Sequence, residues 1–165
     1  MDIYEKQLII AEILENLYNN TQIVYPMTED KKILLITLQK TRIFLSECIN
    51  LALLTEFKKG KIRKTQNPEK NLENFFKVYR AVLNQEEINA IKNLFKIAKN
   101  QRESEMDFKR KEKIIVLSKN SEYQEISMEK ITKWIETGIK IYQTSSKIIN
   151  KQTIEELNSQ NNLLR

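Results

Sequence analysis

The sequence predicts an all-α fold, a bundle of about five helices with a small β-hairpin before the last helix. The 165 residues include only two glycines and two prolines, and because these residues mark most turns, their scarcity favours a few long helices. Apolar residues recur at three- and four-residue spacing over most of the chain, as in amphipathic helices. We expect a single helical-bundle domain over residues 1–157 and a frayed or disordered tail over 158–165.

The first predicted helix runs from Asp2 to Asn19, where an Asn-Asn-Thr sequence stops it. Its apolar residues recur at helical spacing, and its acidic residues lie opposite them. The link that follows, over residues 22–27, is predicted to be extended. The reason is Pro26, since a proline disfavours the helical conformation of the residue before it, here Tyr25.

The second predicted helix is the longest and the most apolar. Thr28 is its expected N-cap, and it is expected to reach Phe57 and to end near Gly60. A helix with so little polar surface is expected at the centre of a bundle. The residues expected to share its buried face are Leu34, Leu38, Thr41, Leu45, Cys48 and Ala52. The residues expected to form its narrower polar stripe are Lys32, Gln39, Arg42, Ser46 and Asn50.

Two further helices are predicted by their starting residues. Asn67-Pro68 places an asparagine at the N-cap and a proline at the first helical position, which begins a helix that continues through Leu83. Asn84, with Glu87 three residues later, resembles a capping box, and the helix it begins is expected to fray between residues 100 and 104.

The hairpin and the last helix complete the predicted bundle. Residues 113–118 and 123–127 are predicted to pair around a turn. Ser127 is the expected cap of the last helix, whose periodic pattern weakens after Asn150. Gly138 in the middle of this helix costs about 1 kcal/mol relative to alanine. We therefore expect that another helix approaches closely at Gly138.

The chain contains no histidine and one cysteine, Cys48. It therefore lacks the Ser-His and Cys-His nucleophile pairs, the histidine zinc motifs and any internal disulfide. We expect Cys48 to be an inert buried thiol, because no histidine is available to activate it. Two glycines are too few for a phosphate-binding glycine loop. No cofactor and no metal site is expected, and an enzymatic role is disfavoured.

The charged residues offer the candidate binding sites. The formal net charge is +6, which fits weak binding to nucleic acid or an acidic partner and equally fits a solvated lysine-rich surface. Two basic clusters lie over residues 58–64 and 109–113. If the fold brought them together, they would form a surface that follows a phosphate backbone. The candidate nucleic-acid-binding residues are Lys58, Lys59, Lys61, Arg63, Lys64, Arg102, Lys109, Arg110, Lys111 and Lys113. The nearby aromatics that could stack on bases, or else belong to the core or the hairpin, are Phe57, Phe108 and Tyr123.

Two of these features have simpler interpretations as well. Arg102 either contacts phosphate, with Glu103 or Glu105 nearby, or stabilises the negative end of its helix in front of a solvated acidic turn. The polar stripe from Gln39 to Asn50 either lines a cleft or a dimer interface, or is the solvent-exposed face of an amphipathic helix.

The order of elements resembles the HEPN (higher eukaryotes and prokaryotes nucleotide-binding) superfamily of helical bundles, over roughly residues 31–149. The resemblance is carried by this order and by residues 102–111, Arg-Glu-Ser-Glu-Met-Asp-Phe-Lys-Arg-Lys. Many members are dimeric metal-independent ribonucleases that use an arginine followed, after four to six residues, by a histidine. Here Asp107, Phe108 and Lys109 stand at those positions after Arg102. The resemblance therefore implies a non-catalytic member.

We accordingly expect a non-catalytic protein-interaction or dimerisation module, as a homo-oligomer or with a partner protein. The alternative is a basic RNA-binding protein or a degenerate metal-independent ribonuclease that uses Arg102. The start of the chain shows no secretory signal, and no stretch has the roughly 18 consecutive apolar residues that span a bilayer. We expect a cytoplasmic protein with no membrane contact.

Overall fold

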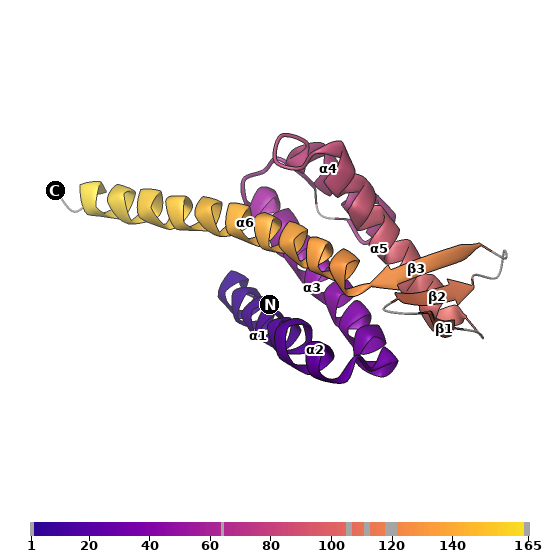
Figure 1. Cartoon of the computed structure of the whole chain (residues 1–165). Coiled ribbons are helices and arrows are strands. Elements are labelled where there is room, and N and C mark those ends of the chain that lie inside the picture. Colours follow the sequence, from indigo (N-terminus) through magenta and orange to yellow (C-terminus); the bar gives the residue numbers. More distant parts are fainter. Residues whose placement is uncertain (1, 64, 105–106, 111–112, 118–121, 164–165) are drawn as a thin grey trace.

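A computed structural model gives the architecture of the chain (Figure 1). It describes the backbone of residues 2–63, 65–104, 107–110, 113–117 and 122–163, and the side chains of these residues except 107–110 and 156–163. The helices are α1 (Ile3–Asn19), η1 (Asn20–Val24, a π-helix), α2 (Tyr25–Thr28), α3 (Lys31–Lys58), α4 (Pro68–Tyr79), α5 (Gln85–Glu103) and α6 (Met128–Leu163). The strands are β1 (Asp107–Arg110), β2 (Lys113–Leu117) and β3 (Tyr123–Ser127). The predicted all-α bundle with a small hairpin before the last helix is confirmed.

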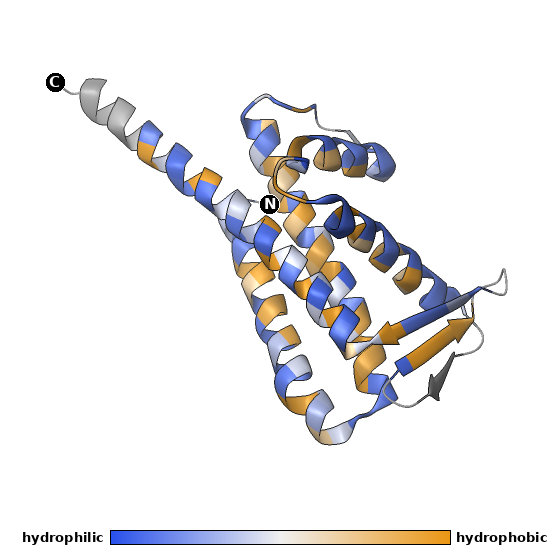
Figure 2. Cartoon of the chain, turned by 45° about the horizontal axis from the view of Figure 1, so that its top comes forward, coloured by the Kyte–Doolittle hydropathy of each residue, from blue (hydrophilic) through white to orange (hydrophobic). Residues whose placement is uncertain are grey.

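Helix α3 is the central element. It packs most extensively against α6 and α1 and also contacts α4 and α5. Every residue predicted to share its buried face, from Leu34 to Ala52, is buried. Figure 2 shows apolar residues along α3 and mostly polar residues along the outer side of α5. The high apolar content of the sequence over 33–57 therefore reflects a helix that has neighbours on several sides.

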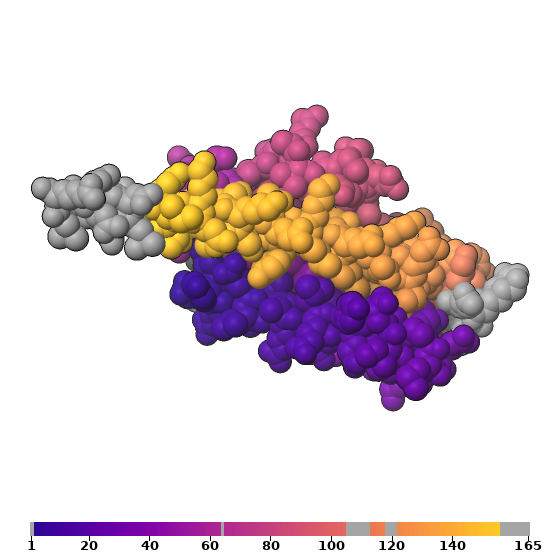
Figure 3. All heavy atoms as spheres, turned by 60° about the vertical axis from the view of Figure 1, so that its left-hand side comes forward, coloured from indigo at the N-terminus to yellow at the C-terminus, as the bar shows by residue number. Residues whose placement is uncertain are grey.

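The contact between α3 and α6 is closest at Gly138. A Cβ atom placed on Gly138 would lie 2.4 Å from a ring carbon of Phe44, whose side chain is fully buried. This contact confirms the predicted close helix–helix approach and explains why a glycine is present in the middle of α6. The partner is a helix of the same chain. In Figure 3, α6 lies across the bundle between α1 and the α4–α5 pair.

The helix starts follow the predicted capping chemistry with one exception. Asn67 Oδ1 accepts hydrogen bonds from the backbone of Glu69 and Lys70, and Asn84 with Glu87 forms a complete capping box. Ser127 Oγ accepts from the backbone of Lys130 at 3.3 Å. The prediction that Thr28 caps α3 is wrong, because Asp30 is the N-cap of this helix.

The link before α3 differs from its prediction. Residues 20–28 are helical, as η1 and α2, although an extended segment was predicted. Tyr25 keeps helical dihedral angles before Pro26 and is buried, so the packing of its ring outweighs the local steric preference. The break comes instead at Glu29, which has a left-handed φ of 46°. Asp30 then caps α3, and its Oδ1 accepts from the backbone of Lys32 at 2.8 Å.

The small sheet has three antiparallel strands in the order β1-β2-β3. The predicted pairing of β2 with β3 is confirmed, with Ile115 opposite Glu125, and β1 adds a strand that the sequence analysis did not predict. Ile114, Val116 and Ile126 are buried and join the sheet to the helical core. The predicted helix before the sheet ends at Glu103, within the expected range.

Helix α6 is the longest element, and its second half extends beyond the other helices (Figure 1). It continues to Leu163, into the range for which the sequence predicts a frayed tail. No helix in the described part of the chain is both long enough and apolar enough to cross a membrane.

Candidate functional site

One side of α3 stays open although the helix is central. Four residues on this side are spaced by seven, a separation that brings side chains back to nearly the same direction after two turns. The three apolar members, Ile36, Ile43 and Phe57, are 41%, 42% and 43% exposed, and the polar member Asn50 is also exposed. Single exposed apolar residues are ordinary, but a row of them along one central helix marks a candidate contact surface.

Two walls flank this row. On one side, α1 is joined to α3 by an ion pair between Lys6 and Glu47 at 2.6 Å and by a hydrogen bond from Lys40 to Asn16 at 3.4 Å. On the other side, Gln39 Nε2 donates to the carbonyl of Ala98 at 3.2 Å and to Gln101 Oε1 at 2.7 Å, which ties α3 to α5. The open side of α3 is therefore the floor of a groove between α1 and the α4–α5 pair.

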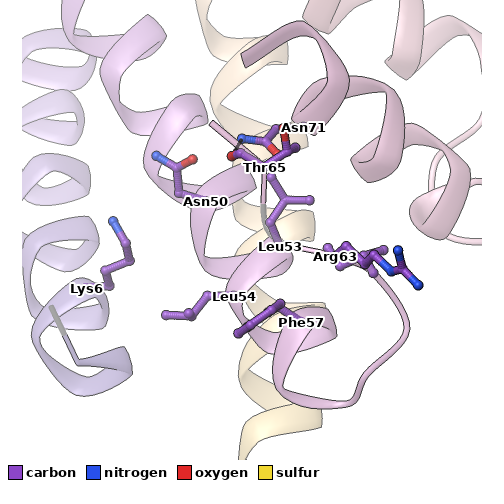
Figure 4. A pocket seen from close by; sticks show the side chains of 9 residues that line it. Lys6, Asn50, Leu53, Leu54, Phe57, Arg63, Thr65 and Asn71 are labelled. Carbon is purple, nitrogen blue, oxygen red and sulfur yellow. Dashed lines mark hydrogen bonds between the residues drawn. The ribbon is translucent and has the colours of Figure 1, made fainter. Parts of the chain in front are cut away.

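The groove is deepest toward the C-terminal end of α3, where two hollows of about 310 and 410 Å³ adjoin. They share three lining residues, Asn50, Leu53 and Asn71. Figure 4 shows the smaller hollow, with side chains that come from α1, α3, the loop before α4, and α4 itself. The amide of Asn71 donates to the carbonyl of Thr65 at 3.0 Å and so fixes the loop at its rim.

We call this surface the α3 groove. Its floor and its two hollows are formed by Lys6, Ile36, Ile43, Ser46, Ile49, Asn50, Leu53, Leu54, Phe57, Ile62, Arg63, Thr65, Pro68, Glu69, Asn71, Leu72 and Phe95. The lining mixes aliphatic and aromatic carbon with amides and hydroxyls, the composition found where proteins bind ligands and partner segments.

The charge at the groove is mainly positive. Lys6 and Glu47 neutralise each other, and Glu69 lies at the rim of the larger hollow. Arg63 lines the smaller hollow. Arg42 lies one turn before Ser46 on the side of α3 toward α5, and Arg102 ends α5. Among the described residues, none of these three arginines forms an ion pair with a carboxylate.

Arg42 and Arg102 form the most unusual electrostatic feature of the groove. Burial and the nearby positive charge of Arg102 lower the pKa of the Arg42 guanidinium. The Nε atom of Arg42 is buried and has no hydrogen-bond partner in the described part of the chain. Arg102 itself is exposed.

The described residues of the two predicted basic clusters do not come together. Those of the first cluster lie at and after the C-terminal end of α3, and those of the second belong to β1 and β2, near the opposite end of that helix (Figure 1). Among the described side chains, three lysines of these clusters contact carboxylates. Lys59 and Lys61 lie 3.4 and 3.5 Å from Glu56. Lys113 lies 2.6 Å from Glu125, and the hydrogen bond to Glu125 raises the pKa of Lys113.

Several other candidate residues are placed individually. Lys58 is exposed beyond the end of the groove, and Tyr123 is exposed on the sheet. Phe57 belongs to the open side of α3 and not to the core. Lys64 and Lys111, together with the side chains of Phe108, Lys109 and Arg110, lie outside the described residues, as does Glu105. Within the described part, no carboxylate is paired with Arg102.

The predicted polar stripe of α3 is the part of the sequence analysis that points to the groove. Gln39 and Arg42 face α5, while Ser46 and Asn50 line the hollows. Cys48 is buried on the opposite side, where desolvation raises the pKa of its thiol and keeps it in the unreactive form. The apolar floor of the groove was not among the predicted site residues, although the seven-residue spacing from Ile36 to Phe57 indicates a row of apolar side chains along one side of the helix.

The outer side of α1 carries three apolar residues, Tyr4, Leu8 and Tyr18, that are each more exposed than the apolar residues of the groove floor. These residues lie on the outside of a helix, and none of them lines a hollow described here. The outer side of α1 therefore serves as a control surface for binding experiments, because it has similar exposed residues that line none of these hollows.

Comparisons of the chain with protein-family models, with curated protein sequences and with solved structures gave no match. The resemblance to the HEPN superfamily stays a prediction. Among the described residues, no three histidine, cysteine, aspartate or glutamate side chains are grouped so that they could hold a metal ion.

Proposed function

We propose that this protein is a protein-interaction module and that its α3 groove binds an amphipathic, acidic helix of another protein. The observation that carries the proposal is the row of Ile36, Ile43 and Phe57 on the open side of the central helix, beside two hollows. Helix-in-groove recognition uses the same elements, an apolar stripe on the ligand and an apolar groove with polar walls on the receptor.

The charge around the groove selects the partner. Arg42, Arg63 and Arg102 form no ion pair with a described carboxylate, so they favour a ligand with negative charge beside its apolar stripe. A second copy of this chain whose groove faced this one would add the same arginines to the interface, and an excess of like charge at an interface costs free energy. The arginines therefore favour an acidic partner over this symmetric pairing.

The length of the groove sets the length of the ligand. A helix of about 20 residues is about 30 Å long, which matches the stretch of α3 from Ile36 to Phe57. A suitable probe is a fluorescein-labelled synthetic helix of this length, with leucines along one side and glutamates on both flanks. A peptide of the same composition in scrambled order is its control.

The test is fluorescence anisotropy with the wild-type chain and two matched variants. Ile43→Asp places a charge on the groove floor and should weaken peptide binding about tenfold or more, because a carboxylate cannot be buried there without cost. Leu8→Asp makes the same change on the outer side of α1, where the leucine is 68% exposed, and should leave binding unchanged. Circular dichroism would establish that both variants fold.

Two results would contradict the proposal. The first is that the wild-type chain binds the amphipathic peptide no better than the scrambled peptide. The second is that Leu8→Asp weakens binding as much as Ile43→Asp does. Sedimentation of the wild-type chain at high concentration separates a further alternative, since a dimer that Ile43→Asp dissociates would assign the groove to a second copy.

A further inference from the structure

The Arg42 guanidinium has donors that the described part of the fold leaves unused. Its side chain is half-buried, and its buried Nε–H finds no acceptor among the described residues. Arginine carries five N–H donors and no acceptor, so an acceptor must come from another group. A buried donor without an acceptor costs about 1–3 kcal/mol, and each such group in a folded protein calls for an explanation.

Hydrogen bonds join helices α3 and α5 next to Arg42 and Arg102. Gln39, one turn before Arg42, donates to Ala98 and Gln101 on the last turns of α5, and Arg102 follows directly. The two positive charges are thus held close enough that Arg102 acts on the ionisation of Arg42. Within the described chain, no carboxylate is ion-paired with either arginine.

This arginine pair lies beside the α3 groove. Arg42 directly precedes Ile43 of the groove floor, and one turn later Ser46 lines the larger hollow with Ile49 and Phe95. Ser46 Oγ donates to the carbonyl of Arg42, so its hydroxyl proton is already used. A helix that lies on Ile43 and extends toward α5 would carry one flank past Arg42, whose side chain is half-buried on that side.

We infer that Arg42 and Arg102 form a subsite that binds a carboxylate side chain of the helix that docks in the α3 groove. This inference rests on the proposed function and names the group that positions the partner. A carboxylate offers two oxygens, can accept from both guanidinium groups and neutralises part of their repulsion. Charge-assisted hydrogen bonds of this kind fix the register of the bound helix in addition to its affinity.

The test compares two peptides on four proteins. The peptides are the acidic amphipathic helix and a version in which every glutamate is glutamine. The proteins are the wild type, Arg42→Gln, Arg102→Gln and Arg80→Gln. Arg80 is an exposed arginine at the end of α4 that is not among the groups acting on the ionisation of Arg42, so it is a matched control.

We expect the wild type to prefer the acidic peptide by about tenfold at low salt, a ratio that corresponds to one or two charge-assisted hydrogen bonds. The preference should fall to about twofold in Arg42→Gln and in Arg102→Gln and should persist in Arg80→Gln. Binding of the glutamine peptide should be nearly the same in all four proteins, because the apolar floor is unchanged.

The failures of the two proposals can be told apart. If neither peptide binds the wild type, the proposed function is wrong. If both peptides bind the wild type equally, or if Arg42→Gln keeps the full preference, groove binding stands and the carboxylate subsite is overturned. A third result also overturns it, namely that a single-stranded oligouridylate displaces the acidic peptide from the wild type but has lost its binding to Arg42→Gln. That result would assign the subsite to phosphate.

Discussion

Helix α3 has one side that is tightly packed against α6 and one side that is partly exposed to solvent. On the side toward α6, Phe44 is fully buried against Gly138, with ring carbons so close that only a glycine fits. On the open side, its neighbour Ile43 is 42% exposed, and on the adjoining side toward α5 the buried Nε of Arg42 has no hydrogen-bond partner among the described residues. The closed side is filled by side chains of the same chain, whereas the open side leaves apolar side chains in contact with water. We propose that the open side binds a partner.

The largest expected difference between the two sides comes from truncating adjacent residues. Phe44→Ala should lower the free energy of unfolding by about 3–5 kcal/mol, since it leaves a cavity in a dense core. Ile43→Ala should lower it by less than about 1 kcal/mol, because the side chain is partly in water already. Urea unfolding followed by circular dichroism measures both. Similar losses for the two variants would contradict the comparison.

A smaller effect is expected from adding a methyl group to the closed side. Gly138→Ala should destabilise the protein by about 1–3 kcal/mol through overpacking, less the helix propensity that alanine gains, about 1 kcal/mol. In a Phe44→Leu background the ring carbons that clash are absent, so the same alanine should become neutral or stabilising. An equal cost of Gly138→Ala in both backgrounds would show that Phe44 does not explain the glycine.

The ion pair between Glu87 of α5 and Lys140 of α6 should make the free energy of unfolding depend on pH. Desolvation raises the pKa of Glu87, but the hydrogen bonds from Lys140 and from the backbone of Asn84 outweigh it, and the net pKa is lowered. A lowered folded-state pKa stabilises the protein above the ordinary carboxyl pKa of about 4.3, and this stabilisation is lost as the pH falls. Glu87→Gln should therefore cost about 1 kcal/mol at neutral pH, and the cost should disappear in acid.

The matched control for this prediction is Glu86→Gln, which changes the exposed neighbour in the same helical turn. Thermal unfolding across an acid-to-neutral pH series measures both variants. If Glu87→Gln costs the same at low and neutral pH, the ion pair with Lys140 and the capping hydrogen bond do not depend on the charge of Glu87.

The smallest expected effect on stability comes from Arg42, which lies next to the open side. Arg42→Met removes a partly buried charge whose Nε–H has no acceptor among the described residues, and it retains much of the side-chain volume. Stability should stay unchanged or rise by about 0.5–1 kcal/mol. The acidic peptide should bind less tightly to the same variant. A clear loss of stability would assign Arg42 to the fold instead of to binding.

Much of the fold could be predicted because its signals are local. Two helix starts are set by residues close in sequence, Asn67 with Pro68 and Asn84 with Glu87. The buried side of α3 is set by apolar residues that recur every three or four positions. Tyr25 departs from its local preference because its ring is buried by distant residues, and Thr28 was displaced as the cap by Asp30, two residues later. Such outcomes depend on tertiary packing, which a sequence pattern does not contain.

The groove could be predicted only in part for the same reason. The polar stripe from Gln39 to Asn50 is visible in the sequence, but its position beside Ile36 and Ile43 depends on where α1 and α5 pack. The pairing of Arg42 with Arg102 joins residues 60 positions apart and follows from the Gln39 contact. Conversely, the described residues of the two basic clusters lie at opposite ends of α3, a separation that the sequence does not reveal.

Isoleucine methyl NMR, with the acidic amphipathic peptide titrated into the wild-type chain, tests most directly whether the open side of α3 is a binding site. We expect the methyl signals of Ile36 and Ile43 to shift first and furthest. Those of Ile10 and Ile131, which are fully buried elsewhere in the bundle, should stay in place. Saturable shifts that centre on residues outside the groove, or no shifts at a peptide concentration well above that of the protein, would contradict it.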